Sequence, residues 1–403
     1  MSDPACAVPL TTIAREWLRI GVTGFGGPPT HIVLLRRLCV SDRRWIGEAE
    51  FEDTIAAVNL LPGPASTQLA IWCGWRLRGT VGALLAGFCF ILPGLLMIIG
   101  LAAVFLAEHP PEIVLGAAAG AGSAVAAVAL HAAWGLAPAS WKRIQNSEDN
   151  ASHIGDKVRW LFYAALGAVS AATIGPWLVL VLLACGLIEV SVRLRGLAVR
   201  SVLPLPLAQP LAQPLAHPLA FLASDSTGTG GLLALAFTAF KVGALSYGGG
   251  FVIIPLMQHD AVGTRHWMSS GQFLDAVALG QITPGPVVQT VAVVGYAAAG
   301  VGGALLAAAV AFAPSFVFVL AGARRFDRLR GNRTVQAFLT GAGPAVIGAI
   351  AGSAVPLAAA LARPWQYVLL VLAAAWLLLL RRGVVSALLL SAACGAVVAL
   401  SCP

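Results

Sequence analysis

Charge is what this sequence has least of. Only 10% of its 403 residues are charged, whereas 59% are hydrophobic and the mean hydropathy is +0.86. A water-soluble domain of this length could not hide so much apolar surface. Uncharged stretches such as 81–106 and 113–134 are each long enough to cross a bilayer as a helix. We therefore predict an all-α polytopic membrane protein whose surroundings are the lipid bilayer.

Catalytic, nucleotide-binding and metal-binding motifs are also missing. The sequence has no P-loop, no HExxH or HxxxH spacing among its seven histidines, and no CxxC pair among its seven cysteines. The formal charge of +8 comes from basic residues in short loops between apolar stretches, where such residues determine membrane orientation. We predict no enzyme activity, no cofactor, no metal and no nucleic-acid partner.

An internal repeat organises the chain. The segment containing Phe25-Gly26-Gly27, Trp45 and Pro62-Gly63-Pro64 returns as Tyr247-Gly248-Gly249, Trp267 and Pro284-Gly285-Pro286, displaced by 222 positions (284 − 62). The match falls largely on residues with special backbone or ring geometry, and it needs no gap between residues 25 and 68. We take 10–198 and 230–402 as two transmembrane repeats.

The segment 199–229 is predicted to link the repeats in the cytoplasm. Its prolines recur at nearly every fourth position between 203 and 220, which removes backbone donors and favours an extended, semi-rigid spacer over a membrane helix. A proline-motif ligand for a partner protein is the alternative.

Loop charge predicts that the repeats are inverted in the membrane. The loop at 108–112 has no Lys or Arg, whereas the equivalent loop at 324–330 has four Arg. Because Lys and Arg stay on the cytoplasmic side, these loops should lie on opposite sides. Five crossings per repeat plus a re-entrant hairpin would satisfy this topology. Inverted repeats with interrupted helices are typical of secondary transporters.

Each Pro-Gly-Pro (PGP) motif is predicted to break a helix inside the membrane. A helix that starts there leaves backbone N–H groups unpaired and presents the positive end of its dipole, which favours an anion. The alternative is a pair of proline kinks whose polar neighbours bond nearby carbonyls; two inverted copies favour the site. The candidate substrate-binding residues are Asn59, Pro62, Gly63, Pro64, Ser66, Thr67 and Gln68, and Gln281, Pro284, Gly285, Pro286, Gln289 and Thr290.

Two glycine pairs and two cations extend this candidate site. The pairs Gly26-Gly27 and Gly248-Gly249 either expose backbone N–H groups to the same anion or let two helices cross closely. Six residues before each aromatic-Gly-Gly stands a cation, Arg19 or Lys241, which could attract the anion or balance its charge. Arg19 could equally extend to the membrane interface.

Asp53 and Asp275 are equivalent carboxylates, each nine residues before its PGP motif. They are candidates for carrying a proton, or for capping a helix or pairing with Arg43 or Arg265. The spacing of Gly116 and Gly120 permits close helix packing, within one protomer or between two in a homodimer.

The motifs together resemble a known family. FGGPPTHIVLLRR, LLPGPASTQLAIWCGW and FILPG in the first half, with SYGGGFVIIPLM, QITPGPVVQTVAVVGY and AFAPS in the second, resemble the chromate ion transporter (CHR) superfamily in its two-domain form. The resemblance implies a bacterial or archaeal inner-membrane protein that exports chromate and confers chromate resistance, with sulfate as a related anion and with proton coupling. The residues also leave open a sulfate or other small-anion permease, a passive anion channel, and a scaffold or enzyme subunit.

Overall fold

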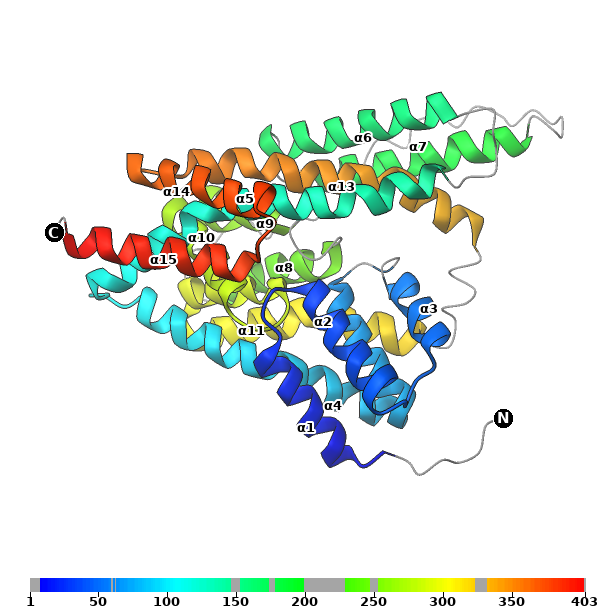
Figure 1. The fold of residues 1–403 in the computed structure, drawn as a ribbon, viewed down its shortest axis with the longest axis horizontal. Helices are drawn as coiled ribbons and strands as arrows, with labels where there is room; N and C mark the ends of the chain where they lie inside the picture. Colours follow the sequence, from blue (N-terminus) through cyan, green and yellow to red (C-terminus); the bar gives the residue numbers. More distant parts are fainter. Residues whose placement is uncertain are drawn as a thin grey trace.

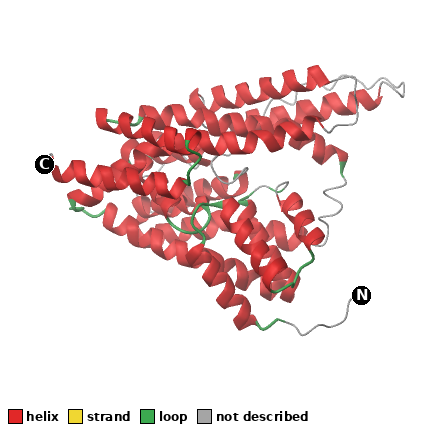
Figure 2. Ribbon diagram, in the orientation of Figure 1, coloured by secondary structure: helices red, strands yellow, loops and turns green. Residues whose placement is uncertain are grey.

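The computed structural model describes residues 8–58, 61, 63–145, 153–173, 178–198, 229–246, 253–322 and 332–401. Every regular element within these ranges is helical, as Figure 2 shows. The predicted all-α class is therefore confirmed for the described part of the chain. Asn59, Pro62, Gly248 and Gly249 of the predicted site lie outside the described residues.

The helices fall into two series that follow the two repeats. The first series is α1 (Leu10–Thr23), α2 (Pro28–Arg36), η1 (Arg37–Asp42), α3 (Glu48–Val58), α4 (Ala65–Phe105), α5 (Glu112–Gln145), α6 (His153–Thr173) and α7 (Leu178–Ala198). The second is α8 (Thr229–Leu245), α9 (Ile253–Gln258), η4 (His259–Thr264), α10 (Ser270–Ile282), η5 (Val287–Gln289), α11 (Thr290–Gly322), α13 (Arg333–Ala359), α14 (Pro364–Ala374), η7 (Ala375–Leu379) and α15 (Val384–Ser401).

Five stretches of the described chain are long and apolar enough to cross a membrane as helices. They are Ala65–Phe105, Glu112–Pro138, Val287–Gly322, Arg333–Ala359 and Val384–Ser401. Their number confirms a polytopic membrane protein. The five crossings expected in each repeat stay a prediction; two further apolar helices of the described chain, Gly231–Leu245 and Pro364–Leu379, are shorter than these five.

The two halves adopt the same local backbone. In the first, the Trp45 N–H donates to the Cys39 carbonyl at 2.8 Å; in the second, the Trp267 N–H donates to the Ala261 carbonyl at 2.8 Å. Each of these turns follows a π-helical turn, η1 or η4. α4 and α11 are also kinked alike, with a positive φ of 60° at Gly79 and 61° at Gly300. The repeated glycines therefore mark conformations that other residues rarely adopt.

The register between the repeats shifts by one residue just after the PGP motifs. Gly63 and Gly285 are 222 positions apart (285 − 63), whereas the kink residues Gly79 and Gly300 are 221 apart (300 − 79). α4 begins directly as an α-helix, but α11 is preceded by the 3-10 turn η5, and the segment is one residue shorter there.

Gln289 consequently takes the structural place of Gln68. A Cβ atom added to Gly63 would meet the Gln68 amide, and one added to Gly285 would lie 2.9 Å from Gln289 Oε1. The ungapped sequence match is therefore wrong at Gln68, because the 3-10 turn brings a glutamine to the same place with one residue fewer.

The long helices of each repeat pack against helices of the other. α5 lies against α14 and α15, while α13 lies against α6 and α7, and α4 packs against α11 (Figure 1). These contacts are close because they involve glycine: a Cβ atom on Gly116 or Gly120 would meet the backbone at Gly395 in α15. The Gly116–Gly120 pair therefore packs within one chain. A homodimer stays a prediction.

Equivalent connections lie at opposite ends of the molecule. In Figure 1 the connection between α4 and α5 lies at the left, whereas α11 ends and α13 begins at the right. The first helix of each repeat crosses the long helix of its own repeat at a glycine: a Cβ atom on Gly21 would lie 2.8 Å from the Phe90 carbonyl, and one on Gly243 would meet the Ala311 carbonyl. α1 thus packs on α4 as α8 packs on α11.

Candidate anion-binding site

The two PGP loops lie at the interface between the repeats, and each is held by the other repeat. The Gly63 N–H donates to the Ser246 carbonyl at the end of α8, at 2.8 Å. The Gly285 N–H donates to the Gly24 carbonyl at the end of α1, at 3.2 Å. Both loop glycines have a positive φ, 122° and 110°. Each loop therefore bonds to the other repeat at the interface between them, and we call the two loops exchanged.

Each loop also packs against the long kinked helix of the other repeat. A Cβ atom on Gly94 in α4 would meet the Pro284 carbonyl, and one on Gly63 would lie 3.0 Å from Ser315 Oγ in α11. Gly94 and Ser315 directly follow Pro93 and Pro314. The Gln289 side chain adds a tether, because its Nε2 donates to the Ile91 carbonyl in α4 at 2.9 Å.

The helix that follows the first loop begins in the protein interior. Pro64 has extended backbone and precedes α4, and its carbonyl accepts from the N–H groups of Thr67 and Gln68 at 2.9 and 3.0 Å. Ser66, Thr67 and Gln68 are fully buried. A helix start offers further N–H groups without intrahelical partners and the positive end of the helix dipole, and both favour a negative ligand.

Several buried polar atoms around the loops have no hydrogen-bond partner within the part of the chain that the structure describes. They are Thr67 Oγ1, Ser246 Oγ, Gln281 Nε2, Gln289 Oε1 and Ser315 Oγ. A buried polar group without a partner costs about 1–3 kcal/mol, so native proteins rarely gather such groups unless a ligand or water satisfies them. Four of the five can donate a hydrogen bond, which suits an oxyanion.

His31 also belongs to this region, although the sequence reasoning did not select it. Its imidazole is fully buried, with Nε2 2.8 Å from the Gly24 carbonyl oxygen and Nδ1 3.3 Å from Ser66 Oγ. The ring also meets Phe90 edge-on, with 4.9 Å between ring centroids. The second repeat has Ile253 at the equivalent position, so the repeat itself carried no signal for His31. The available signal was a histidine in the first turn of a helix that follows the Gly-Gly turn.

Of the two glycine pairs predicted to take part, the first forms the turn between α1 and α2. Gly26 and Gly27 have positive φ values of 101° and 73°, so the turn requires glycine. In the second loop, Pro286 precedes η5 with extended backbone, and Thr290 Oγ1 donates to the Val287 carbonyl at 2.9 Å.

The two predicted cations contact carboxylates of their own repeats. Lys241 Nζ lies 2.5 Å from Asp260 Oδ2, which also accepts from Thr238 Oγ1 at 2.9 Å. The Arg19 side chain is 77% exposed and lies 3.8 Å from Glu16, whose main partner is Arg43 at 2.9 Å. None of these ion pairs includes a residue of a PGP loop, and a substrate role for Arg19 and Lys241 stays a prediction.

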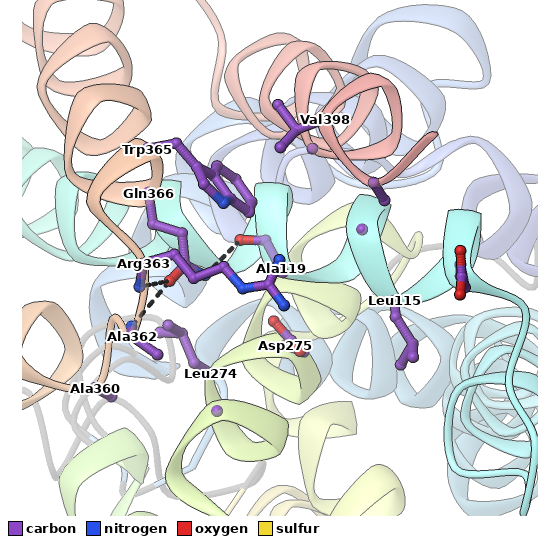
Figure 3. A pocket seen from close by; sticks show the side chains of 15 residues that line it. Leu115, Ala119, Leu274, Asp275, Ala360, Ala362, Arg363, Trp365, Gln366 and Val398 are labelled. Atoms are coloured by element: carbon purple, nitrogen blue, oxygen red, sulfur yellow. Dashed lines mark hydrogen bonds between the residues drawn. The ribbon is translucent and has the colours of Figure 1, made fainter. Parts of the chain in front are cut away.

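A second polar region lies at the N-terminal half of α10 (Figure 3). A cavity of about 440 Å³ is lined there by residues of α5, α10, α14 and α15, and the half-buried Asp275 carboxylate faces it. Figure 3 shows the Arg363 side chain extending toward Asp275. Glu112, at the start of α5, is the other charged residue of the lining. Asp53, the equivalent of Asp275, is exposed on α3.

The matched family model is described as chromate transporter, and it covers residues 11–190 and 233–399. The chain belongs to the chromate transporter family. It is 31% identical over 358 residues to the chromate transport protein of Cupriavidus metallidurans, an alignment that covers 87% of this chain and 82% of that protein. It is 30% identical over 351 residues to the chromate transport protein of Pseudomonas aeruginosa, covering 85% and 80%. No solved structure matches the chain.

Membership in the chromate transporter family confirms the resemblance seen in the motifs. Chromate transporters are membrane proteins, and the five long apolar helices make this one a multi-pass membrane protein. The two matched stretches each contain one PGP loop, Gly63 in the first and Gly285 in the second. The exchanged loops are thus part of the family domain and not of an added segment.

Proposed function

We propose that the protein is a secondary transporter that exports chromate across the bacterial inner membrane and thereby confers chromate resistance. The observation that carries the proposal is the exchange of the PGP loops, in which Gly63 bonds Ser246 and Gly285 bonds Gly24. Because each loop is held by the other repeat, a movement of one repeat against the other changes the space beside both helix starts. Such a movement around a fixed central site is the usual basis of alternating access.

The repeats are inserted in inverted orientation in this proposal. The α4–α5 connection and the α11–α13 ends lie at opposite ends of the molecule in Figure 1, and only the second of these equivalent loops carries Arg. α3 and α10 have 11 and 13 residues, which is too short for a helix to cross the bilayer alone. They therefore enter the membrane as half-helices and return through the helices that follow the PGP loops.

Export follows from the charge of the substrate. With the cell interior negative, moving a dianion outward is favoured by roughly 4.6 kcal/mol per 100 mV, twice the value of about 2.3 for one charge. Import of the same anion would need coupling to several cations. The Asp275 carboxylate, in its cavity, is the group we assign to proton coupling.

The proposal is tested by chromate flux in proteoliposomes that contain the purified protein. The membrane potential and the pH gradient are imposed separately, and excess sulfate is added as a competitor. Gly63→Leu and Gly285→Leu place a side chain in the loops. Gly100→Leu and Gly302→Leu are controls that add the same side chain where nothing lies within 4 Å of a Cβ atom.

We expect saturable, sulfate-sensitive flux that follows the membrane potential, that is lost in both loop variants and that persists in both controls. Absence of chromate flux would contradict the substrate. Flux that does not saturate and shows no counterflow would indicate a channel. Unchanged flux in correctly inserted loop variants would contradict the site.

A further inference from the structure

Each PGP loop forms a half-site with the residues around it. The two half-sites have similar backbone conformations but differ in their side chains. Around the first loop stand Ser246, at the end of α8, and Ser315, in α11. The equivalent positions around the second loop are Gly24 and Gly94. The helix starts differ in the same direction, since Ser66 and Thr67 follow the first loop and Val287 and Val288 follow the second. At these equivalent positions, hydroxyl groups are therefore found around the first loop only.

Three of these hydroxyls are fully buried and have no partner in the described part of the chain. They belong to Thr67, Ser246 and Ser315, and each of these residues is 0% exposed. Buried hydroxyls on other helices usually bond a carbonyl of the preceding turn: Ser123 donates to Gly120, and Ser353 donates to Ile350 at 2.7 Å. Ser170 in α6 is the remaining unpartnered buried hydroxyl within the described ranges.

The three residues that carry these hydroxyls lie around Gly63. Ser246 accepts the Gly63 N–H through its own carbonyl at 2.8 Å, and Ser315 Oγ lies 3.0 Å from where a Gly63 Cβ atom would be. The Thr67 N–H bonds the carbonyl of Pro64, the residue after Gly63. All three residues therefore lie beside the start of α4, where the helix dipole is positive, and the Ser315 hydroxyl is the one placed directly against Gly63.

The second half-site is closely packed. A Cβ atom on Gly94 would meet the Pro284 carbonyl, so α4 and the second loop touch backbone to backbone. The Gln289 amide is tied to the Ile91 carbonyl, and the Thr290 hydroxyl already donates to Val287. Beside this loop the unpartnered buried side-chain atoms of the described chain are the amide atoms Gln281 Nε2 and Gln289 Oε1, whereas beside the first loop they include three hydroxyls.

We propose that a tetrahedral oxyanion binds at the first PGP loop only, held by the hydroxyls of Thr67, Ser246 and Ser315 at the start of α4, while the second loop is a packed, anion-free counterpart. The proposal rests on the anion-transport function proposed above and assigns its binding site. Uncharged donors hold a dianion without a fixed opposite charge, which keeps its release easy.

The origin of the donors explains how release would occur. Thr67 belongs to the first repeat, whereas Ser246 and Ser315 belong to the second. The full set of donors exists only while the two repeats keep this arrangement. A movement that separates the first loop from α8 and α11 divides the donors and weakens the hold on the anion.

The test is equilibrium binding of radiolabelled sulfate and of chromate to the purified full-length protein in detergent. Thr67→Val, Ser246→Ala and Ser315→Ala each remove one hydroxyl, and Ser123→Ala is the matched control, because that buried hydroxyl bonds its own helix. Loss of a hydrogen bond to a charged ligand should weaken binding roughly tenfold or more in each hydroxyl variant. The control should bind as the unchanged protein does.

Binding that is the same in all four variants would overturn the assignment and would mean that water alone occupies the hydroxyls. Absence of anion binding to the unchanged protein would overturn it as well. Flux measured in parallel separates this proposal from the transport function: if the unchanged protein binds anions through the three hydroxyls but carries no chromate, the site stands and the transport function fails. If chromate flux is normal in all three hydroxyl variants, the function stands and the site fails.

Discussion

The two PGP loops have nearly the same backbone conformation but different neighbouring side chains. Gly63 and Gly285 share a positive φ, a bond to the end of the other repeat's first helix, and a nearby glutamine. Three residues around the first loop carry unpartnered hydroxyls, whereas glycine and valine occupy the equivalent positions around the second. The duplicated backbone builds the interface between the repeats, while a few side-chain differences set apart the half in which we propose that an anion binds.

We expect the strongest destabilisation when a side chain is added at Gly94, beside the second loop. Gly94→Ala places a Cβ atom against the Pro284 carbonyl, which is backbone and cannot rotate away. We expect a loss of stability of about 1–3 kcal/mol or more, seen as a lower melting temperature of the purified protein and less inserted protein. Ser315→Ala, at the equivalent position, should insert normally. Equal melting temperatures for the two variants would show that the halves are packed alike.

We expect a smaller loss of stability when His31 in the first repeat is replaced by the isoleucine of the second repeat. His31→Ile gives the first repeat the residue found at position 253. It removes the contacts of the imidazole with the Gly24 carbonyl and with Ser66 Oγ. Each lost hydrogen bond is worth about 1 kcal/mol, so thermal unfolding should shift down by several degrees. An unchanged melting temperature would mean that the imidazole does not hold the two segments together.

A third change removes the hydrogen bond between the second loop and α4. Gln289→Leu removes the 2.9 Å bond from Nε2 to the Ile91 carbonyl. We expect a stability loss of about 1 kcal/mol and sulfate affinity close to that of the unchanged protein, because the second loop is the anion-free half in our proposal. A tenfold loss of affinity with normal stability would assign the anion to the second loop instead.

The smallest structural effect is expected at the cavity beside α10, where the effect should be on pH dependence. Asp275→Asn keeps the shape of the side chain and removes its ionisation, leaving Arg363 and Glu112 as the charged groups of the lining. We expect flux at fixed membrane potential to lose its response to an imposed pH gradient. Asp53→Asn, on the exposed face of α3, is the matched control and should keep that response. The same response in both variants would remove Asp275 from proton coupling.

Much of the fold followed from the sequence because it rests on local chemistry. Apolar length predicted the membrane helices, and prolines and glycines predicted the helix breaks at Pro64 and Pro286 and the special backbone of Gly63 and Gly285. These features depend on the residue itself and its immediate neighbours. The helix breaks and the glycine conformations can therefore be predicted without knowing which residues pack nearby.

The partners of the loops could not be found in this way. Ser246, Ser315 and Gly94 matter because of contacts between the repeats, and no local pattern reveals those contacts. The shift that brings Gln289 to the place of Gln68 comes from a 3-10 turn, which the ungapped match concealed. The equivalence of Pro93-Gly94 and Pro314-Ser315, at the shifted spacing of 221 (314 − 93), was the one available sequence signal.

Locating chromate itself by anomalous scattering from chromium in crystals of the protein is the most direct measurement. We expect one strong peak beside Gly63, within hydrogen-bond reach of the hydroxyls of Thr67, Ser246 and Ser315, and none at Gly285. A peak at the second loop, or in the cavity between Asp275 and Arg363 with the first loop empty, would contradict it.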